Sequence, residues 1–147
     1  MKERLAVIVC ATVAIAALSA CSKGPVEPPL KPGELAVGTA SVTVNGQDAG
    51  TTTAVACVRD GNLTTITTGD SKAGTTMVVD NGRGLAAKSV SIRNIGGFTG
   101  SYWQGLDGSA EIRPIGSTLD VKGEAFGFNA ASPSARTSGT FRINVAC

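Results

Sequence analysis

The sequence has 147 residues, a formal net charge of +2 and no histidine. Hydrophobic residues make up 42% of it and aromatic residues only 4%, so a core has to be built from aliphatic side chains. The lack of histidine excludes Ser-His-Asp and Cys-His catalysis and every histidine-ligated metal or haem site. No cofactor or metal is expected, and the balanced charge without a basic cluster argues against a nucleic-acid partner.

The N-terminus is predicted to be a targeting segment over residues 1–20. Lys2 and Arg4 precede an uncharged apolar run over residues 5–17, which is shorter than the roughly 20 residues of a membrane-spanning helix and typical of a secretory signal peptide. The next residues, Leu18-Ser19-Ala20-Cys21, resemble a bacterial lipobox. This resemblance implies cleavage before Cys21, a diacylglycerol on its sulfur and attachment to the extracytoplasmic side of the cell membrane. The alternative is an ordinary secretory signal that ends near an unmodified cysteine.

Residues 21–38 are predicted to form a lipidated, Pro-rich tether. Four of the six prolines of the chain occur in it, at positions 25, 28, 29 and 32. Such a segment favours extended polyproline geometry and cannot form a helix. We interpret it as a semi-rigid spacer that reaches about 50 Å when fully stretched; a Pro-rich ligand for another protein is the alternative.

Residues 39–147 are predicted to form a single β-rich domain, because their hydrophobic periodicity is two. Asn45-Gly46 is a strong hairpin signal, and residues 133–138 are expected to form a loop. Strands are expected at residues 41–44, 53–59, 63–68, 75–79, 88–95, 98–104, 109–115, 119–128 and 140–147. Short strands with turn residues between them indicate an all-β fold, either an antiparallel sandwich or an open barrel.

The last predicted strand shows the alternation clearly, with Phe141, Ile143, Val145 and Cys147 on one face. Since the apolar face must point to the core, Cys147 is expected to be buried. Cys57 and Cys147 are the two cysteines left once Cys21 carries lipid and Cys10 leaves with the signal peptide. In an exported protein they are expected to form a disulfide. The alternative, two free thiols for redox or metal chemistry, lacks a C-x-x-C motif.

Two groups of residues have the side chains for chemistry or ligand binding. Asp120, Lys122 and Glu124 share one face of a predicted strand, which is typical of a charged outward face rather than of an acid/base pair. Tyr102 and Trp103 are adjacent in a strand and must point to opposite faces. Either both faces are covered, or one ring is exposed and could stack on a sugar or insert between acyl chains. If a ligand site exists, Tyr102 and Trp103 are predicted to line it.

Several segments resemble one family. The lipobox, Val42-Thr43-Val44-Asn45-Gly46-Gln47-Asp48, Val55-Ala56-Cys57 and the closing stretch Thr140–Cys147 are similar to the mycobacterial 19-kDa lipoprotein antigens (LpqH-like). Residues 92–103 and 123–127 suggest the LppE branch of that family. The resemblance implies a β-rich envelope lipoprotein with one disulfide and no enzymatic activity. It also implies a surface antigen whose acylated N-terminus is recognised by Toll-like receptor 2. The tether lacks the Ser/Thr-rich run that carries glycans in the best-known member, so glycosylation is not expected.

The predicted function is therefore that of a lipid-anchored envelope antigen that acts by contact and is not an enzyme. Its expected partners are the membrane, through the N-terminal lipid, and a lipid, glycolipid or host receptor. The alternative function is a lipid or glycolipid carrier, which requires an apolar pocket of roughly 300 Å³ or more. The oligomeric state is left open.

Overall fold

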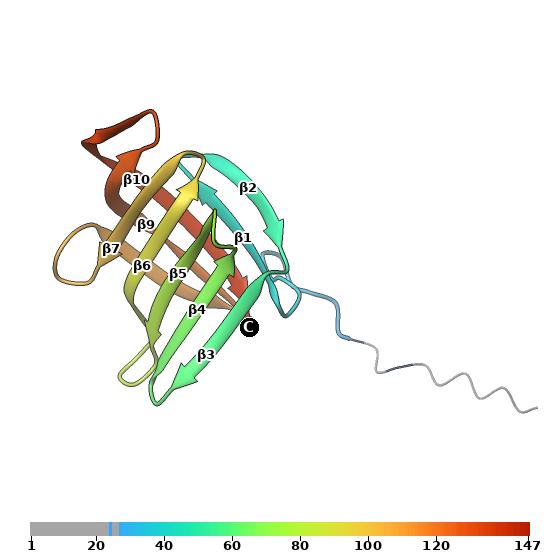
Figure 1. Ribbon diagram of the computed structural model, residues 1–147. Coiled ribbons are helices and arrows are strands. Elements are labelled where there is room, and N and C mark those ends of the chain that lie inside the picture. The colour runs from blue at the N-terminus through green and yellow to red at the C-terminus, as the bar shows by residue number, and fades with distance from the viewer. Residues whose placement is uncertain (1–23, 25–26) are drawn as a thin grey trace, which may run out of the picture.

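The computed structural model describes residue 24 and residues 27–147, and the regular elements of these residues are ten β-strands (Figure 1). The predicted signal peptide and Cys21 lie outside the described residues. The strands are β1 (Thr39–Val44), β2 (Gln47–Thr52), β3 (Val55–Asp60), β4 (Leu63–Gly69), β5 (Gly74–Asp80), β6 (Ala86–Ile95), β7 (Phe98–Trp103), β8 (Ser109–Ile115), β9 (Thr118–Asn129) and β10 (Ser132–Ala146).

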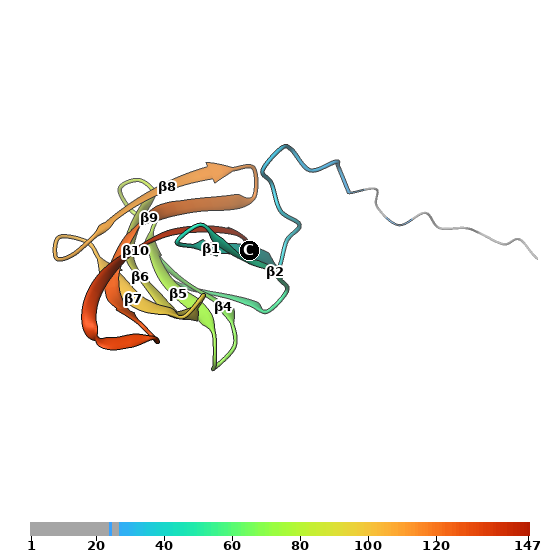
Figure 2. The same ribbon diagram turned by 90° about the horizontal axis from the view of Figure 1, so that it is seen from above.

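All ten strands belong to one antiparallel sheet, with the order β2-β1-β10-β9-β7-β6-β5-β4-β3 and with β8 paired to β9. The sheet curls on itself into a nearly closed barrel (Figures 1 and 2). Its two edges are β2 and β3, which follow each other in the chain but do not pair. The structure thus confirms the all-β class and decides between the two predicted architectures in favour of the barrel.

The core forms where the inward faces of paired strands meet. Val42 of β1 lies opposite Ile143 of β10, and Val44 lies opposite Phe141. All four side chains are buried, and a shift of one residue in this register would turn each of them toward solvent. Asn45 and Gly46 both have positive φ, 51° and 75°, as a tight hairpin turn of type I′ requires.

Two parts of the sheet differ from the sequence-based prediction. β2 was missed, because all but one of its residues are exposed and its sequence has no apolar alternation. The expected loop at residues 133–138 is wrong, because β10 begins at Ser132 and pairs with the end of β9. Between Ser132 and Thr137 the pairing is irregular, and this bulged start explains how a strand accommodates Pro133.

The predicted disulfide is present. Cys57 in β3 and Cys147, directly after β10, are joined with a Cα–Cα distance of 6.0 Å and a sequence separation of 90. The expectation that Cys147 is buried is wrong, because both cysteines are exposed. β10 ends at Ala146, which is itself buried, so the alternation of that strand stops one residue before the cysteine.

The second half of the predicted tether is held against the barrel. The Glu34 carboxylate accepts hydrogen bonds from the backbone N–H and the hydroxyl of Ser117, at 2.9 and 3.1 Å, and from the backbone N–H of Lys31 at 3.1 Å. These bonds, those from the backbone foremost, lower the pKa of Glu34 below its ordinary value. Leu35 donates its N–H to the Thr118 hydroxyl at 2.7 Å. The chain is therefore attached to the β8–β9 turn before it enters β1.

Candidate functional site

Tyr102 and Trp103 end strand β7 and point to opposite sides of the barrel wall. Tyr102 is 6% exposed and belongs to the core, whereas Trp103 is 53% exposed. The Tyr102 ring is therefore covered by the core, and the Trp103 ring is the exposed one.

The wall of the barrel divides next to Tyr102. One edge of β9 is shared by two strands: β8 pairs with residues Thr118–Glu124, and β7 pairs with Phe126–Asn129. β6 pairs with β7 only from Ser89 onward. Its first residues, Ala86 to Lys88, therefore face β8 without a strand-to-strand ladder between them.

This division leaves an open cavity of about 400 Å³ between β6 and β8, called here the β6–β8 slot. Its lining is mixed, because Glu111, Arg113 and Gln104 bring polar groups beside the aliphatic side chains. The apolar lining consists of Leu85, Ala86, Ala87, Ala110, Ile112 and the ring of Tyr102. β6 and β8 have Cα atoms within 8 Å of each other, whereas a strand inserted between them would need about 4.7–4.9 Å on each side. The slot therefore does not admit a further strand.

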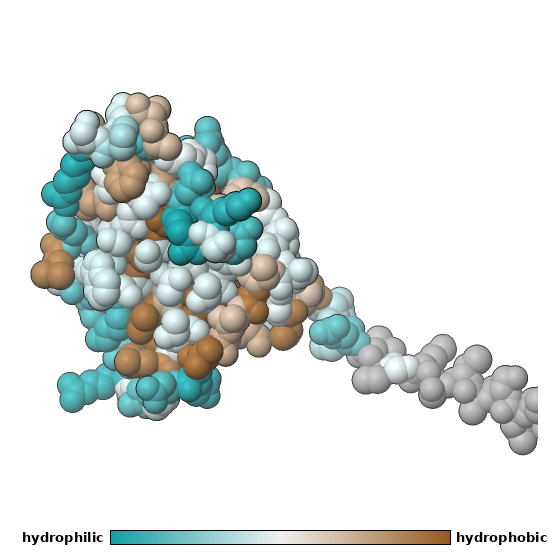
Figure 3. Space-filling view, in the orientation of Figure 1, coloured by the Kyte–Doolittle hydropathy of each residue, from teal (hydrophilic) through white to brown (hydrophobic). Residues whose placement is uncertain are grey.

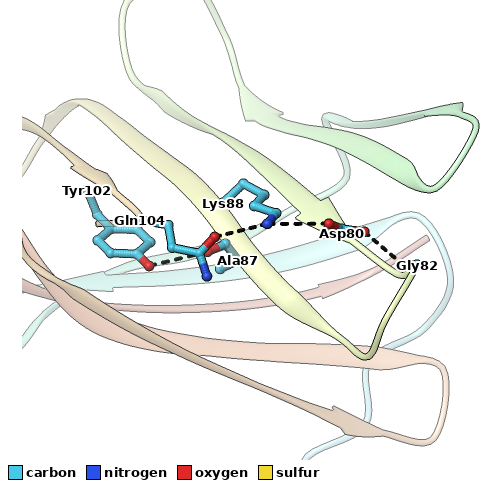
Figure 4. A network of polar contacts seen from close by, with 6 residues as sticks. All are labelled: Asp80, Gly82, Ala87, Lys88, Tyr102 and Gln104. Carbon is cyan, nitrogen blue, oxygen red and sulfur yellow. Dashed lines mark hydrogen bonds and ion pairs between the residues drawn. The ribbon is translucent and has the colours of Figure 1, made fainter. Parts of the chain in front are cut away.

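The Tyr102 hydroxyl reaches across the slot to β6. It donates to the Ala87 carbonyl at 3.3 Å (Figure 4), so the phenol is satisfied as a donor while its oxygen still has acceptor capacity. Burial raises the pKa of Tyr102 above its ordinary value, so the hydroxyl stays protonated at neutral pH.

Polar contacts hold the rim of the slot on the β6 side (Figure 4). Lys88 donates to the Gln104 side chain at 3.0 Å and forms an ion pair with Asp80 at 3.4 Å. The Gly82 backbone N–H donates to Asp80 at 2.8 Å, and this bond, followed by the contact with Lys88, lowers the pKa of Asp80. The Asp80 carboxylate therefore stays charged at neutral pH and keeps its ion pair with Lys88.

Trp103 is exposed but its backbone is fixed. Its carbonyl accepts the N–H groups of Leu106 and Asp107, and its own N–H donates to the Asp107 carbonyl. Asp107 in turn forms an ion pair of 2.6 Å with Arg136 of β10. An exposed indole on an ordered turn loses little conformational freedom on contact, which favours binding.

The charged face predicted on β9 differs from the expectation at one position. Asp120 is buried rather than exposed, because the Arg142 guanidinium covers it with two hydrogen bonds of 2.9 and 3.2 Å. This pairing raises the pKa of Arg142, and it makes Asp120 a structural ion-pair partner. Within the described part of the chain, no three or more cysteine and acidic residues gather into a group that could hold a metal ion, and no helix is long and apolar enough to cross a membrane.

Sequence reasoning selected Tyr102 and Trp103 but missed the aliphatic lining of the slot. Leu85, Ala87 and Ile112 look like ordinary core residues in the sequence. The available signal was length: β9 has 12 residues, whereas β7 has 6 and β8 has 7. A strand this long can pair with two short strands, β8 and β7, in succession along one edge. A slot forms because β6 pairs with β7 but not with β8.

The fold and the disulfide define the chain's described part as a small disulfide-linked β-barrel domain. Residues 33–147 match the family of the Mycobacterium 19 kDa lipoprotein antigen. A chain from Mycobacterium avium subsp. hominissuis that is named only as a lipoprotein is 34% identical over 148 residues, covering 100% of this chain and 97% of its own. Lipoprotein LpqH of Mycobacterium tuberculosis is 32% identical over 107 residues, covering 72% of this chain and 67% of its own. The chain belongs to the Mycobacterium 19 kDa lipoprotein antigen family.

The narrower placement in the LppE branch is not supported. Lipoprotein LppE of Mycobacterium tuberculosis is 34% identical, but over 71 residues that cover 48% of this chain. LpqH and the lipoprotein of the M. avium strain match longer parts of the chain. The family as a whole is therefore the supported level of kinship.

Proposed function

We propose that this protein is an envelope lipoprotein that is anchored by lipid at Cys21 and displays its barrel domain for contact with a partner. Kinship with proteins named as lipoproteins supports the anchor, together with the lipobox at Leu18–Cys21. The barrel contributes no catalysis in this proposal. Recognition of the acylated N-terminus by Toll-like receptor 2 belongs to the same proposal, since it requires only the modified Cys21.

The observation that carries the contact role is the exposed Trp103 on its ordered turn. Leu106, three residues further on, is also exposed, so one hydrogen-bonded turn exposes two large apolar side chains. Aromatic and aliphatic anchors of this kind supply much of the energy of protein and lipid contacts.

The Cys21→Ala variant tests the anchor. It is expected to be released from the membrane and to lack the mass of the acyl chains, because the acylated sulfur is gone. Membrane fractionation and intact-mass spectrometry measure both effects, and Ser22→Ala is a matched control that leaves the cysteine in place. Retention of the Cys21→Ala variant in the membrane would contradict the anchor. Receptor activation in reporter cells is expected to fall with the lipid.

A second candidate function, a carrier for lipid or glycolipid, is favoured by the β6–β8 slot, whose volume of about 400 Å³ and aliphatic lining suit one alkyl chain. Palmitate is a suitable probe, and native mass spectrometry measures its retention by the lipidated protein. Ala110→Phe should block the slot and abolish retention, whereas Ala56→Phe, on the exposed strand β3, should leave it unchanged. Equal retention by both variants, or none by the wild type, would contradict the carrier function.

A further inference from the structure

One end of the barrel gathers the turns that lie next to the tether. Asn81 donates its N–H to the Asn62 carbonyl at 2.8 Å, which joins the β3–β4 and β5–β6 turns. A cavity of about 200 Å³ separates Arg59 and Asn81 from Ser117 and Cys147, so the β8–β9 turn and the C-terminus belong to the same end. We call this surface the tether end. It comprises residues 27–38, the β3–β4 hairpin at residues 58–63, the turns at residues 81–84 and 115–117, and Cys147.

The opposite end carries the other set of turns. Asn45 of the β1–β2 turn donates to the Thr140 carbonyl at 2.9 Å, and Ala130 of the β9–β10 turn donates to the Gly97 carbonyl at 2.8 Å. The two ends are thus defined by separate hydrogen bonds, and they lie at opposite extremes of the strands (Figure 1).

Exposed large hydrophobic side chains are concentrated at the tether end. Val58 and Leu63 flank the β3–β4 turn and are 64% and 41% exposed, and Leu30 and Val37 of the tether are also exposed. In the space-filling view, brown hydrophobic atoms lie beside teal ones along the lower part of the barrel, where β3 and β4 meet (Figure 3). A soluble domain that met only water there would gain nothing from exposing four such side chains together.

The attachment of the tether determines what this end faces. Glu34 and Leu35 fix the chain to Ser117 and Thr118, so only residues 22–30 separate Cys21 from the attached segment, a reach of about 30 Å when extended. The anchor proposed at Cys21 therefore leaves the domain from the same end that exposes Val58 and Leu63.

We infer that the tether end is a lipid-facing surface, which lies against the bilayer that holds the anchor and inserts its exposed apolar side chains among the headgroups. This inference rests on the proposed lipid anchor. The charged side chains of the tether end balance, with Lys31, Arg59 and Arg83 against Glu27, Glu34 and Asp60. Apolar contact rather than attraction to anionic lipid therefore carries the interaction.

In this orientation the opposite end faces away from the membrane, and the barrel wall that bears Trp103 stands to the side of the contact surface. Trp103 lies opposite Ser89, within the β6–β7 ladder, and not in a turn of the tether end, so it stays free for a partner. The tether segment that Glu34 and Leu35 attach to the β8–β9 turn, here called the bracket, sets the tilt of the barrel.

A fluorescent reporter at each end tests the orientation in the full lipidated protein. In a Trp103→Phe background, tryptophan is placed either at Leu63 of the tether end or at Phe128 of the opposite end. The two positions are matched in exposure, 41% and 40%. The proteins are reconstituted in vesicles of phosphatidylcholine brominated near the headgroup, which quenches tryptophan on contact. We expect Leu63→Trp to lose emission relative to unbrominated vesicles and Phe128→Trp to keep it.

Equal quenching of the two reporters, no quenching of either, or stronger quenching at position 128 would overturn the orientation. Failure of the anchor is distinguishable, because an unanchored protein would not float with the vesicles at all. Replacing a third of the lipid by phosphatidylglycerol is expected to leave the quenching unchanged, and a large increase would contradict the apolar mode of contact.

The bracket is tested with Glu34→Ala in the Leu63→Trp protein, since alanine removes the oxygens that accept from Ser117 and Lys31. The variant should keep its lipid and its vesicle association but lose part of the quenching, because the barrel is then free to tilt. Glu27→Ala is the matched control, at a tether carboxylate that makes no hydrogen bond or ion pair to another described residue. Quenching that is unchanged in Glu34→Ala would contradict the role of the bracket.

Discussion

The two strands that the disulfide joins are held in opposite ways. β10 has neighbours on both sides, β1 and β9, and three consecutive inward residues of its second half, Phe141, Ile143 and Val145, are buried. β3 is an edge strand that pairs only with β4, and five of its six residues are exposed. Packing holds β10, whereas one ladder and one covalent bond hold β3. β10 therefore contributes to the core, whereas β3 is attached to the barrel by the disulfide and its pairing with β4.

The largest effect is expected from removing the covalent fastening of β3. Cys57→Ala should lower the free energy of unfolding by about 4–5 kcal/mol, because the unfolded chain loses a cross-link across a long loop. Urea unfolding of the oxidised proteins measures this change. The Cys57→Ala/Cys147→Ala double variant is the control, because it removes the same bond without leaving a free thiol. A loss below about 1 kcal/mol would mean that the ladder with β4 holds β3 unaided.

A smaller but still large effect is expected from the packed strand. Ile143→Ala should cost about 2–5 kcal/mol, since it leaves a cavity where a fully buried side chain stood. The same type of truncation in β3, Val58→Ala, removes a side chain that is 64% exposed and should stay within about 0.5 kcal/mol. Thermal or urea unfolding measures both. Comparable losses in the two variants would refute the contrast between packing and fastening.

The smallest effect concerns a third kind of attachment, the polar bracket of Glu34. The folded-state pKa of Glu34 is lowered, so its contribution is present above the pKa of the unfolded state and is lost as pH falls through the folded-state value. In acid the tether should leave the β8–β9 turn while the barrel stays folded. Amide hydrogen exchange at Ser117 should report this release below the ordinary glutamate range. Glu34→Gln should remove the pH dependence of the Ser117 exchange. If the tether of this variant is still released in acid, another titratable group causes the release.

Most of the barrel could be predicted from the sequence, because period-two alternation marks every strand with one buried face. β2 escaped prediction for the same reason, since Gln47 to Thr52 bury no face. The start of β10 escaped because Pro133 suggests a loop, whereas the pairing with β9 simply bulges around it.

The candidate site was predictable only in part. Alternation placed Tyr102 and Trp103 on opposite faces but could not decide which face is covered. The slot depends on how β7 and β8 divide the edge of β9, and such long-range pairing leaves no local trace. The burial of Asp120 likewise depends on a neighbour from another strand, Arg142.

The disulfide also changes what a protease could achieve. The turn between β7 and β8 is the most exposed apolar point of the described residues, at Leu106, and exposed turns are preferred sites of nicking. This turn lies within the covalent ring that Cys57 and Cys147 close. A cut there would leave two fragments linked and interleaved in one sheet, migrating as one species until a reductant separates them. A chain held by the proposed anchor would thus keep its C-terminal fragment even after its backbone had been cleaved.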